Sequence, residues 1–134
     1  MSTNTVNKKI VRRIFDDVWN QANYNAAGEI FAKPEGVKEY IRNFLAAFPD
    51  LQHEVTEIIA EDGKVVASWT AHGSHAGVFH NILPTNREVA FTGITIAQIE
   101  NGKITQHHTQ WDTRALLEAL GVVPIIRKID GSRL

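Results

Sequence analysis

The chain has 134 residues, of which 43% are hydrophobic and 22% charged, as in an ordinary globular protein. This length suits one domain, placed here over residues 1–134, and it is enough to bury a core without cross-links. The formal net charge of −1 argues against nucleic acid or an anionic membrane as partner, and the absence of cysteine excludes disulfides and fits a cytoplasmic location.

Two amphipathic helices are predicted in the first third of the chain. In residues 7–21 apolar side chains recur every three to four positions with charged residues between them, which is typical of a helix with one buried face. A second helix is predicted from Pro34, a residue favoured in the first turn, to Pro49, which disfavours helix in the residue before it. No apolar run approaches the roughly 20 residues of a membrane-spanning helix.

The middle of the chain changes to strand-like alternation. Asp62-Gly63 and Asn101-Gly102 are hairpin signals, and residues 75–88 contain the glycine, proline and asparagines of a long loop. Around these turns four strands are predicted, over residues 51–60, 65–74, 89–99 and 104–112.

A short last helix is predicted after the fourth strand. Asp112 or Thr113 can cap its start, and Gly121 supplies its stop. Residues 122–134 form a C-terminal tail that is apolar enough to pack on the domain or on a partner subunit.

Helices that precede a run of hairpin-connected strands indicate an α+β fold. An antiparallel sheet of this length twists and curls, so helices laid across its concave side would leave a pocket at the open end. The predicted architecture is therefore helices packed on a strongly curved antiparallel sheet.

Asp112 stands at the end of a strand rich in polar and aromatic side chains. It could simply cap the last helix, which would stabilise the fold by about 1 kcal/mol. It could instead face the pocket, where apolar neighbours would raise its pKa, as suits a general acid/base. The residues alone leave both interpretations open.

Strand alternation places His108 and Gln110 on the same face as Asp112, with His107 and Trp111 on the other. The pairing with the preceding strand has two alternatives. A plain two-residue turn at Asn101-Gly102 brings Thr95 and Ala97 to the face of Asp112, whereas a glycine bulge there brings Ile94, Ile96 and Gln98.

No metal site is expected. The spacing of His72, His75 and His80 matches no ligand motif. The sequence also lacks a nucleophile elbow, a P-loop, a dinucleotide fingerprint and an HExxH motif.

Several segments together resemble a known family. They are AFPDLQHEV, GSHAGVF, LPTNREVAFTGITIAQIENGKI and QHHTQWDTRALLEALGVVP. Over residues 37–124 the chain is similar to the SnoaL-like polyketide cyclases and ester cyclases, which belong to the fold group named after nuclear transport factor two. The resemblance implies a cone-shaped α+β barrel that commonly forms a homodimer.

The resemblance also implies a reaction, an intramolecular aldol ring closure on a polyketide ester without metal or organic cofactor. The partner would then be a small hydrophobic carbonyl compound. Asp112 matches the aspartate that removes a proton flanked by two carbonyls and later returns one. His75 matches the histidine of the family's G-[ST]-H motif, and His75 and His108 are both expected to orient the aspartate or the substrate. The residues expected to bind substrate are Trp69, Phe79, His107, Gln110 and Trp111.

Three further expectations complete the prediction. The same fold could serve as a non-catalytic ligand-binding or dimerisation module. Hydrolysis of an epoxide or similar group would need an arginine beside the aspartate, and Arg114 is the nearest in sequence. Segment 26–33 is shorter than its counterpart in the family and is not expected to hold both a helix and a short strand.

Overall fold

Helices form the first part of the fold. The computed structural model describes residues 2–122. The first helix starts earlier than predicted, because the hydroxyl of Ser2 accepts a hydrogen bond from the amide of Thr5. It runs without a break into a π-helical turn. The elements are α1 (Thr3–Arg13), η1 (Ile14–Trp19), α2 (Tyr24–Ile30) and α3 (Glu35–Ala47).

Segment 26–33, predicted to be too short for both a helix and a strand, holds most of helix α2 and an isolated bridge residue, but none of the strands described. Helix α2 is capped by Asn23, whose side chain accepts from the amide of Ala26. Phe31 then forms a parallel bridge with Ile104. Helix α2 itself was not predicted from the sequence, because α2 buries mainly the small side chains of Ala26 and Ala27, which give little apolar periodicity.

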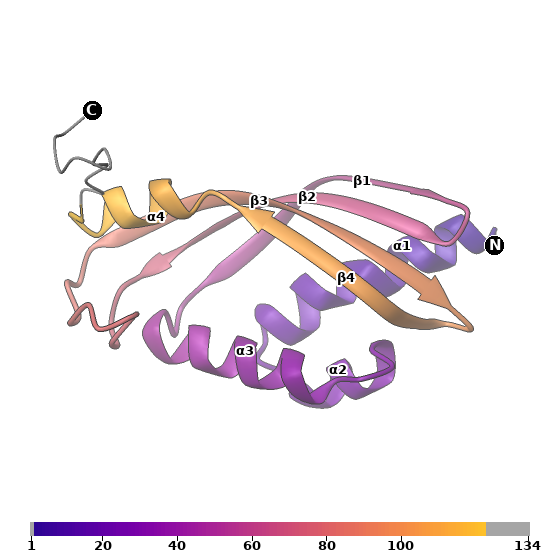
Figure 1. Cartoon of the computed structure of the whole chain (residues 1–134), viewed down its shortest axis with the longest axis horizontal. Helices are drawn as coiled ribbons and strands as arrows, with labels where there is room; N and C mark the ends of the chain where they lie inside the picture. Colours follow the sequence, from indigo (N-terminus) through magenta and orange to yellow (C-terminus); the bar gives the residue numbers. More distant parts are fainter. Residues whose placement is uncertain (1, 123–134) are drawn as a thin grey trace, which may run out of the picture.

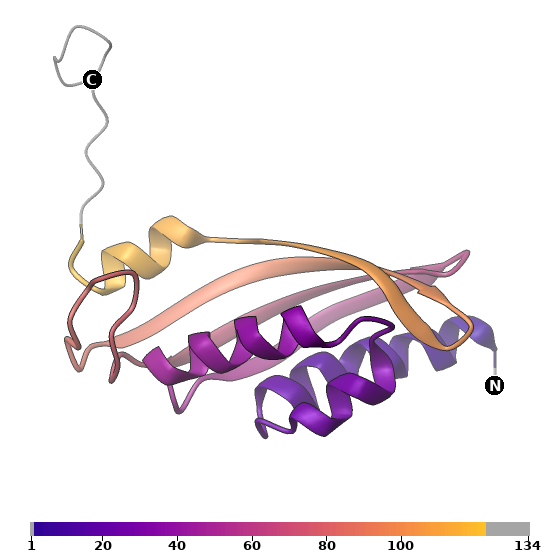
Figure 2. The same cartoon turned by 60° about the horizontal axis from the view of Figure 1, so that its bottom comes forward.

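The four predicted strands form one antiparallel sheet in the order of the chain. They are β1 (Gln52–Glu61), β2 (Lys64–Ser74), β3 (Glu88–Glu100) and β4 (Lys103–Trp111). Asp62-Gly63 and Asn101-Gly102 have positive φ at both positions, as two-residue hairpin turns require. The sheet arches over α1, α2 and α3, which cover its concave face (Figures 1 and 2). The fold is the predicted α+β arrangement.

A bulge decides which side chains of β4 face the helices. Ile99 pairs with Ile104, but Gln98 pairs with Gln106, so Thr105 is the extra residue. The second predicted alternative is therefore correct, with the bulge at Thr105 rather than at the glycine. Ile94, Ile96 and Gln98 lie on the outer face, opposite Gln110, His108 and Gln106.

The loop between β2 and β3 is fastened to the end of α3. The carboxylate of Asp50 accepts from the amide of Ser74 at 2.7 Å, and the amides of Ala76 and Gly77 donate to the carbonyl of Ala47 at 2.9 and 3.0 Å. This anchoring places Phe79 in the core.

Helix α4 (Thr113–Ala119) closes the end of the sheet, and Leu116 is its fully buried contact. Gly121 ends it with φ of 82°. Most of the tail predicted over residues 122–134 lies outside the described residues. None of the helices described is long and apolar enough to cross a membrane.

Candidate functional site

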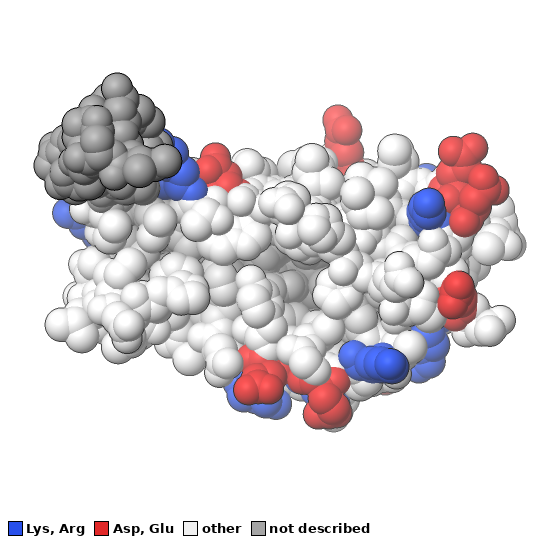
Figure 3. Space-filling model, in the orientation of Figure 1, with Lys and Arg blue, Asp and Glu red and all other residues white. Residues whose placement is uncertain are grey.

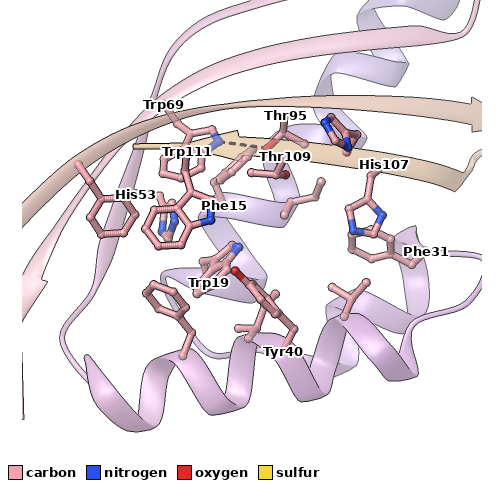
Figure 4. Close-up of a pocket in the computed structure, with 16 residues that line it drawn as sticks. Phe15, Trp19, Phe31, Tyr40, His53, Trp69, Thr95, His107, Thr109 and Trp111 are labelled. Atoms are coloured by element: carbon pink, nitrogen blue, oxygen red, sulfur yellow. Dashed lines mark hydrogen bonds between the residues drawn. The ribbon is translucent and has the colours of Figure 1, made fainter. Parts of the chain in front are cut away.

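A cavity of about 340 Å³ lies between the concave face of the sheet and the helices η1 and α3. The surface is hollowed near the middle of the face shown in Figure 3. All three tryptophans of the chain line the cavity, and Figure 4 shows them with the other labelled side chains. Its size is in the range of small-molecule sites. The main aromatic lining is Phe15, Trp19, Tyr40, Phe44, Trp69 and Trp111.

Each wall follows from local structure. The π-helical turn of η1 brings Phe15 and Trp19 to the cavity. On β2, Trp69 crosses over Gly93 of the neighbouring strand, where a Cβ would lie 2.3 Å from the indole ring. Only glycine leaves room for this indole, so the sheet can present a tryptophan to the cavity at this point.

Among residues 2–122, no aspartate, glutamate, lysine or arginine lines the cavity. The charged side chains visible in Figure 3 lie away from the hollow, toward the edges of the molecule. The polar side chains of the lining are Tyr40, His53, Thr95, His107 and Thr109. His108 also borders the cavity, but its side chain lies on the outer face of β4, beside Gln110. An ionised ligand would lose water here without meeting an opposite fixed charge, so the cavity suits an uncharged ligand.

His53 is held neutral inside an aromatic cluster. Its ring centroid lies 4.6 Å from Trp19 and 4.9 Å from Trp69, and 6% of the residue is exposed. Burial lowers the pKa of His53 to about 3. The side chain of Asn20 fixes its backbone through two hydrogen bonds, of 2.7 and 2.9 Å.

His107 and Tyr40 are the other titratable groups of the cavity whose pKa values depart from the ordinary ones. Burial lowers the pKa of His107, whose ring lies against Phe31 at 5.2 Å. Burial raises the pKa of Tyr40, and the nearby indole of Trp111 partly offsets this. Both shifts favour the uncharged form at neutral pH, so His107 can accept a proton and Tyr40 can donate a hydrogen bond.

A chain of hydrogen bonds crosses the roof of the cavity. The indole N–H of Trp69 donates to the Thr95 hydroxyl at 3.1 Å, and the hydroxyls of Thr95 and Thr109 lie 2.9 Å apart. Figure 4 shows the two threonines together beneath the sheet.

Asp112 lies outside this cavity. Its carboxylate accepts a hydrogen bond of 2.9 Å from the amide of Ala115 and caps α4, as one of the two sequence interpretations predicted. Asp112 is exposed and borders a shallow depression on the outer face, together with Gln110. Arg114, on the first turn of α4, is paired with Glu118 rather than with Asp112.

The other predicted site residues divide into two groups. The side chains of Trp69, His107 and Trp111 line the cavity, whereas His108 borders it with its side chain on the outer face of β4. His75 and Phe79 do not: His75 is fully buried with its ring bonded to Thr85 at 3.0 Å, and Phe79 packs in the core.

Sequence reasoning missed several cavity residues. Phe15 and Trp19 lie in the first predicted helix but were not among the predicted site residues, and Tyr40, His53 and Thr109 were given no role. Alternation along β4 could have found Thr109, because it lies on the face of His107 and Trp111. The contribution of Tyr40 and His53 depends on how α3 and β1 meet in space, and no local pattern reports that.

The family model described as SnoaL-like polyketide cyclase matches residues 9–120. The chain belongs to the SnoaL-like polyketide cyclase family. No curated protein matches the sequence significantly.

Solved structures share the fold of this SnoaL-like protein. AclR of Streptomyces galilaeus, a proposed hydroxylase, is 24% identical with a TM-score of 0.79, covering 96% of this chain and 88% of its own. TsrD of Streptomyces laurentii is 20% identical with a TM-score of 0.84, and the match covers 92% of this chain and 100% of TsrD. IdmH of Streptomyces antibioticus, a proposed polyketide cyclase, is 21% identical with a TM-score of 0.78, covering 87% and 99%. Identities this low show the fold and no activity.

Proposed function

We propose that this SnoaL-like protein binds a small, uncharged, apolar carbonyl compound of polyketide type and promotes its cyclisation or isomerisation without a cofactor. The observation that carries the proposal is the cavity itself. It is about 340 Å³ in volume, and the described residues that line it are mainly aromatic, with a few neutral polar groups and no formally charged side chain. Such a lining binds apolar carbon frameworks and hydrogen-bonds carbonyl oxygens.

The proton transfer is proposed to run through His107. Because its pKa is lowered, the ring is neutral at pH 7 and can remove a proton from carbon between two carbonyls. The resulting enolate carbon would bond to a further carbonyl carbon of the same molecule. The imidazolium would then return the proton to the alkoxide oxygen so formed.

Asp112 remains the competing acid/base from the family resemblance. The carboxylate of Asp112 now accepts a hydrogen bond of 2.9 Å from the amide of Ala115. To act in the cavity, the carboxylate would have to give up this bond. In that version His75 would act as a positioning residue, although it is fully buried in the loop. The two assignments predict different results for the same pair of variants.

Deuterium uptake by ethyl benzoylacetate in D2O measures the proposed step directly. We expect wild-type protein to accelerate exchange at the carbon between the carbonyls, and His107→Gln to reduce that acceleration at least about 10-fold. Asp112→Asn is the matched control, because asparagine caps a helix as well as aspartate does. Loss of exchange in Asp112→Asn, with His107→Gln unaffected, would transfer the role to Asp112.

A non-catalytic ligand-binding module is the second candidate. It is supported by the use of Asp112 as a helix cap and by a cavity lining that, in the part of the chain that the structure describes, contains no carboxylate. Binding of ethyl benzoylacetate without any accelerated exchange would favour this candidate over the enzyme.

A homodimer is proposed as the assembly. Besides the family resemblance, it is supported by Ile94 and Ile96 on the outer face of the sheet, which are 49% and 46% exposed. Light scattering is expected to give twice the mass of one chain, and replacement of both isoleucines by glutamate to halve it. The cytoplasmic location stays a prediction from the sequence.

A further inference from the structure

The direction of the hydrogen bonds in the roof of the cavity can be deduced from chemistry. An indole N–H only donates, so the Thr95 oxygen must accept from Trp69. Thr95 is 3% exposed, and its remaining hydroxyl neighbour among the described residues is Thr109, at 2.9 Å. If Thr109 donated to Thr95, the hydrogen of Thr95 would be buried without an acceptor, which is costly.

The favoured order is therefore Trp69 to Thr95 to Thr109, each donating to the next. Thr109 then uses its oxygen as an acceptor within the protein and keeps its own hydrogen for another partner. Thr109 is exposed and lines the cavity, between His107 and Trp111 on the same face of β4. In Figure 4 its side chain lies at the roof of the cavity, with Tyr40 on the opposite side.

We propose that Thr109 is a specificity-determining residue, whose hydroxyl hydrogen is directed by Trp69 and Thr95 to a carbonyl oxygen of the ligand. This assignment rests on the proposed function and adds the group that distinguishes a ketone or ester from a hydrocarbon of the same shape. Because Thr95 already orients the Thr109 hydroxyl, this hydroxyl loses little conformational freedom when the ligand binds. None of the described lining residues carries a formal charge that would compete for that oxygen.

A pair of probes isolates this hydrogen bond. 2-Acetylnaphthalene and 2-isopropenylnaphthalene have nearly the same shape, but only the first carries a carbonyl oxygen. Both can be titrated by quenching of tryptophan fluorescence, since all three tryptophans line the cavity. We expect wild-type protein to bind the ketone roughly 3- to 10-fold more tightly than the hydrocarbon, as one neutral hydrogen bond allows.

Variants of Thr109 and Thr95 give the decisive comparison. Thr109→Val, which keeps the shape, should abolish the preference for the ketone by weakening ketone binding. Thr109→Ser should retain the preference. Thr95→Val should weaken it, because Thr109 loses the donor that orients it.

Each contrary result has a distinct meaning. A Thr109→Val protein that keeps the ketone preference would overturn the assignment, as would equal binding of both probes by the wild type. A stronger preference in Thr95→Val would show that Thr109 donates to Thr95 in the native protein, and would also overturn it. Wild-type protein that binds neither probe would overturn the proposed function together with this assignment.

Discussion

Acidification from about pH 7 to about pH 4.5 is expected to remove roughly 2–3 kcal/mol of unfolding free energy through His53 alone. The folded protein holds this ring neutral, with a pKa of about 3, whereas in the unfolded chain it protonates below about 6.5. The contribution of neutral His53 to the unfolding free energy is thus fully present above pH 6.5 and is lost as the pH falls toward 3. Urea unfolding at both pH values measures it.

A variant without the titrating group separates His53 from other acid-sensitive contacts. Asp50, whose pKa is lowered mainly by the amide of Ser74, also loses a favourable interaction in acid. His53→Phe keeps an aromatic ring among Phe15, Trp19 and Trp69 but cannot take up a proton. Its stability should therefore fall less than that of the wild type over the same range, while the exposed His80→Gln should behave like the wild type. Equal losses in wild type and His53→Phe would contradict the explanation.

Gly77→Ala is expected to destabilise the protein by about 2 kcal/mol or more. A Cβ at this position would lie 2.1 Å from the carbonyl oxygen of Ala46 and 3.1 Å from the Cα of Ala47. Both are backbone atoms of α3, so no side chain can move aside, and overpacking of this kind is costly. The loop would have to leave α3 and give up the hydrogen bonds of its amides to Ala47. Thermal unfolding of the variant gives the measurement.

The matched control is the same substitution at Gly28 in α2, where no atom lies within 4 Å of the added Cβ. There alanine should stabilise the helix by up to about 1 kcal/mol, because glycine is the poorer helix former. Opposite signs for the two substitutions would support the contact at Gly77. A loss of similar size at both positions would contradict the explanation by close approach.

The motifs that carry the family resemblance contact one another in the structure. The Phe-Pro-Asp segment meets the Gly-Ser-His segment, since Asp50 accepts from the amide of Ser74 and Phe48 packs on His75 at 5.3 Å. The Pro-Thr segment joins them through Thr85, whose amide donates to the His75 ring at 3.2 Å. These motifs hold a loop to a helix. This explains why they identify the fold while leaving the substrate open.

Local chemistry along the chain determined the elements of this protein. Positive φ at Asp62-Gly63 and Asn101-Gly102 closes two hairpins, and Asp112 and Gly121 bound the last helix, all as short-range patterns predict. The α+β class follows from the order of these elements. Helix α2 was the exception, because alanines pack closely without producing a strong apolar pattern.

Only the tertiary structure decided which residues form the site. A one-residue change in pairing moves every side chain of a strand to the other face of the sheet. The bulge at Thr105 therefore decides that Thr109 and Trp111 face the helices and that Gln110 lies outside. His53 and Tyr40 reach the cavity because β1 and α3, distant in sequence, meet the same face of the sheet. Burial among those elements is also what keeps His53 neutral, and burial is a property of packing rather than of sequence.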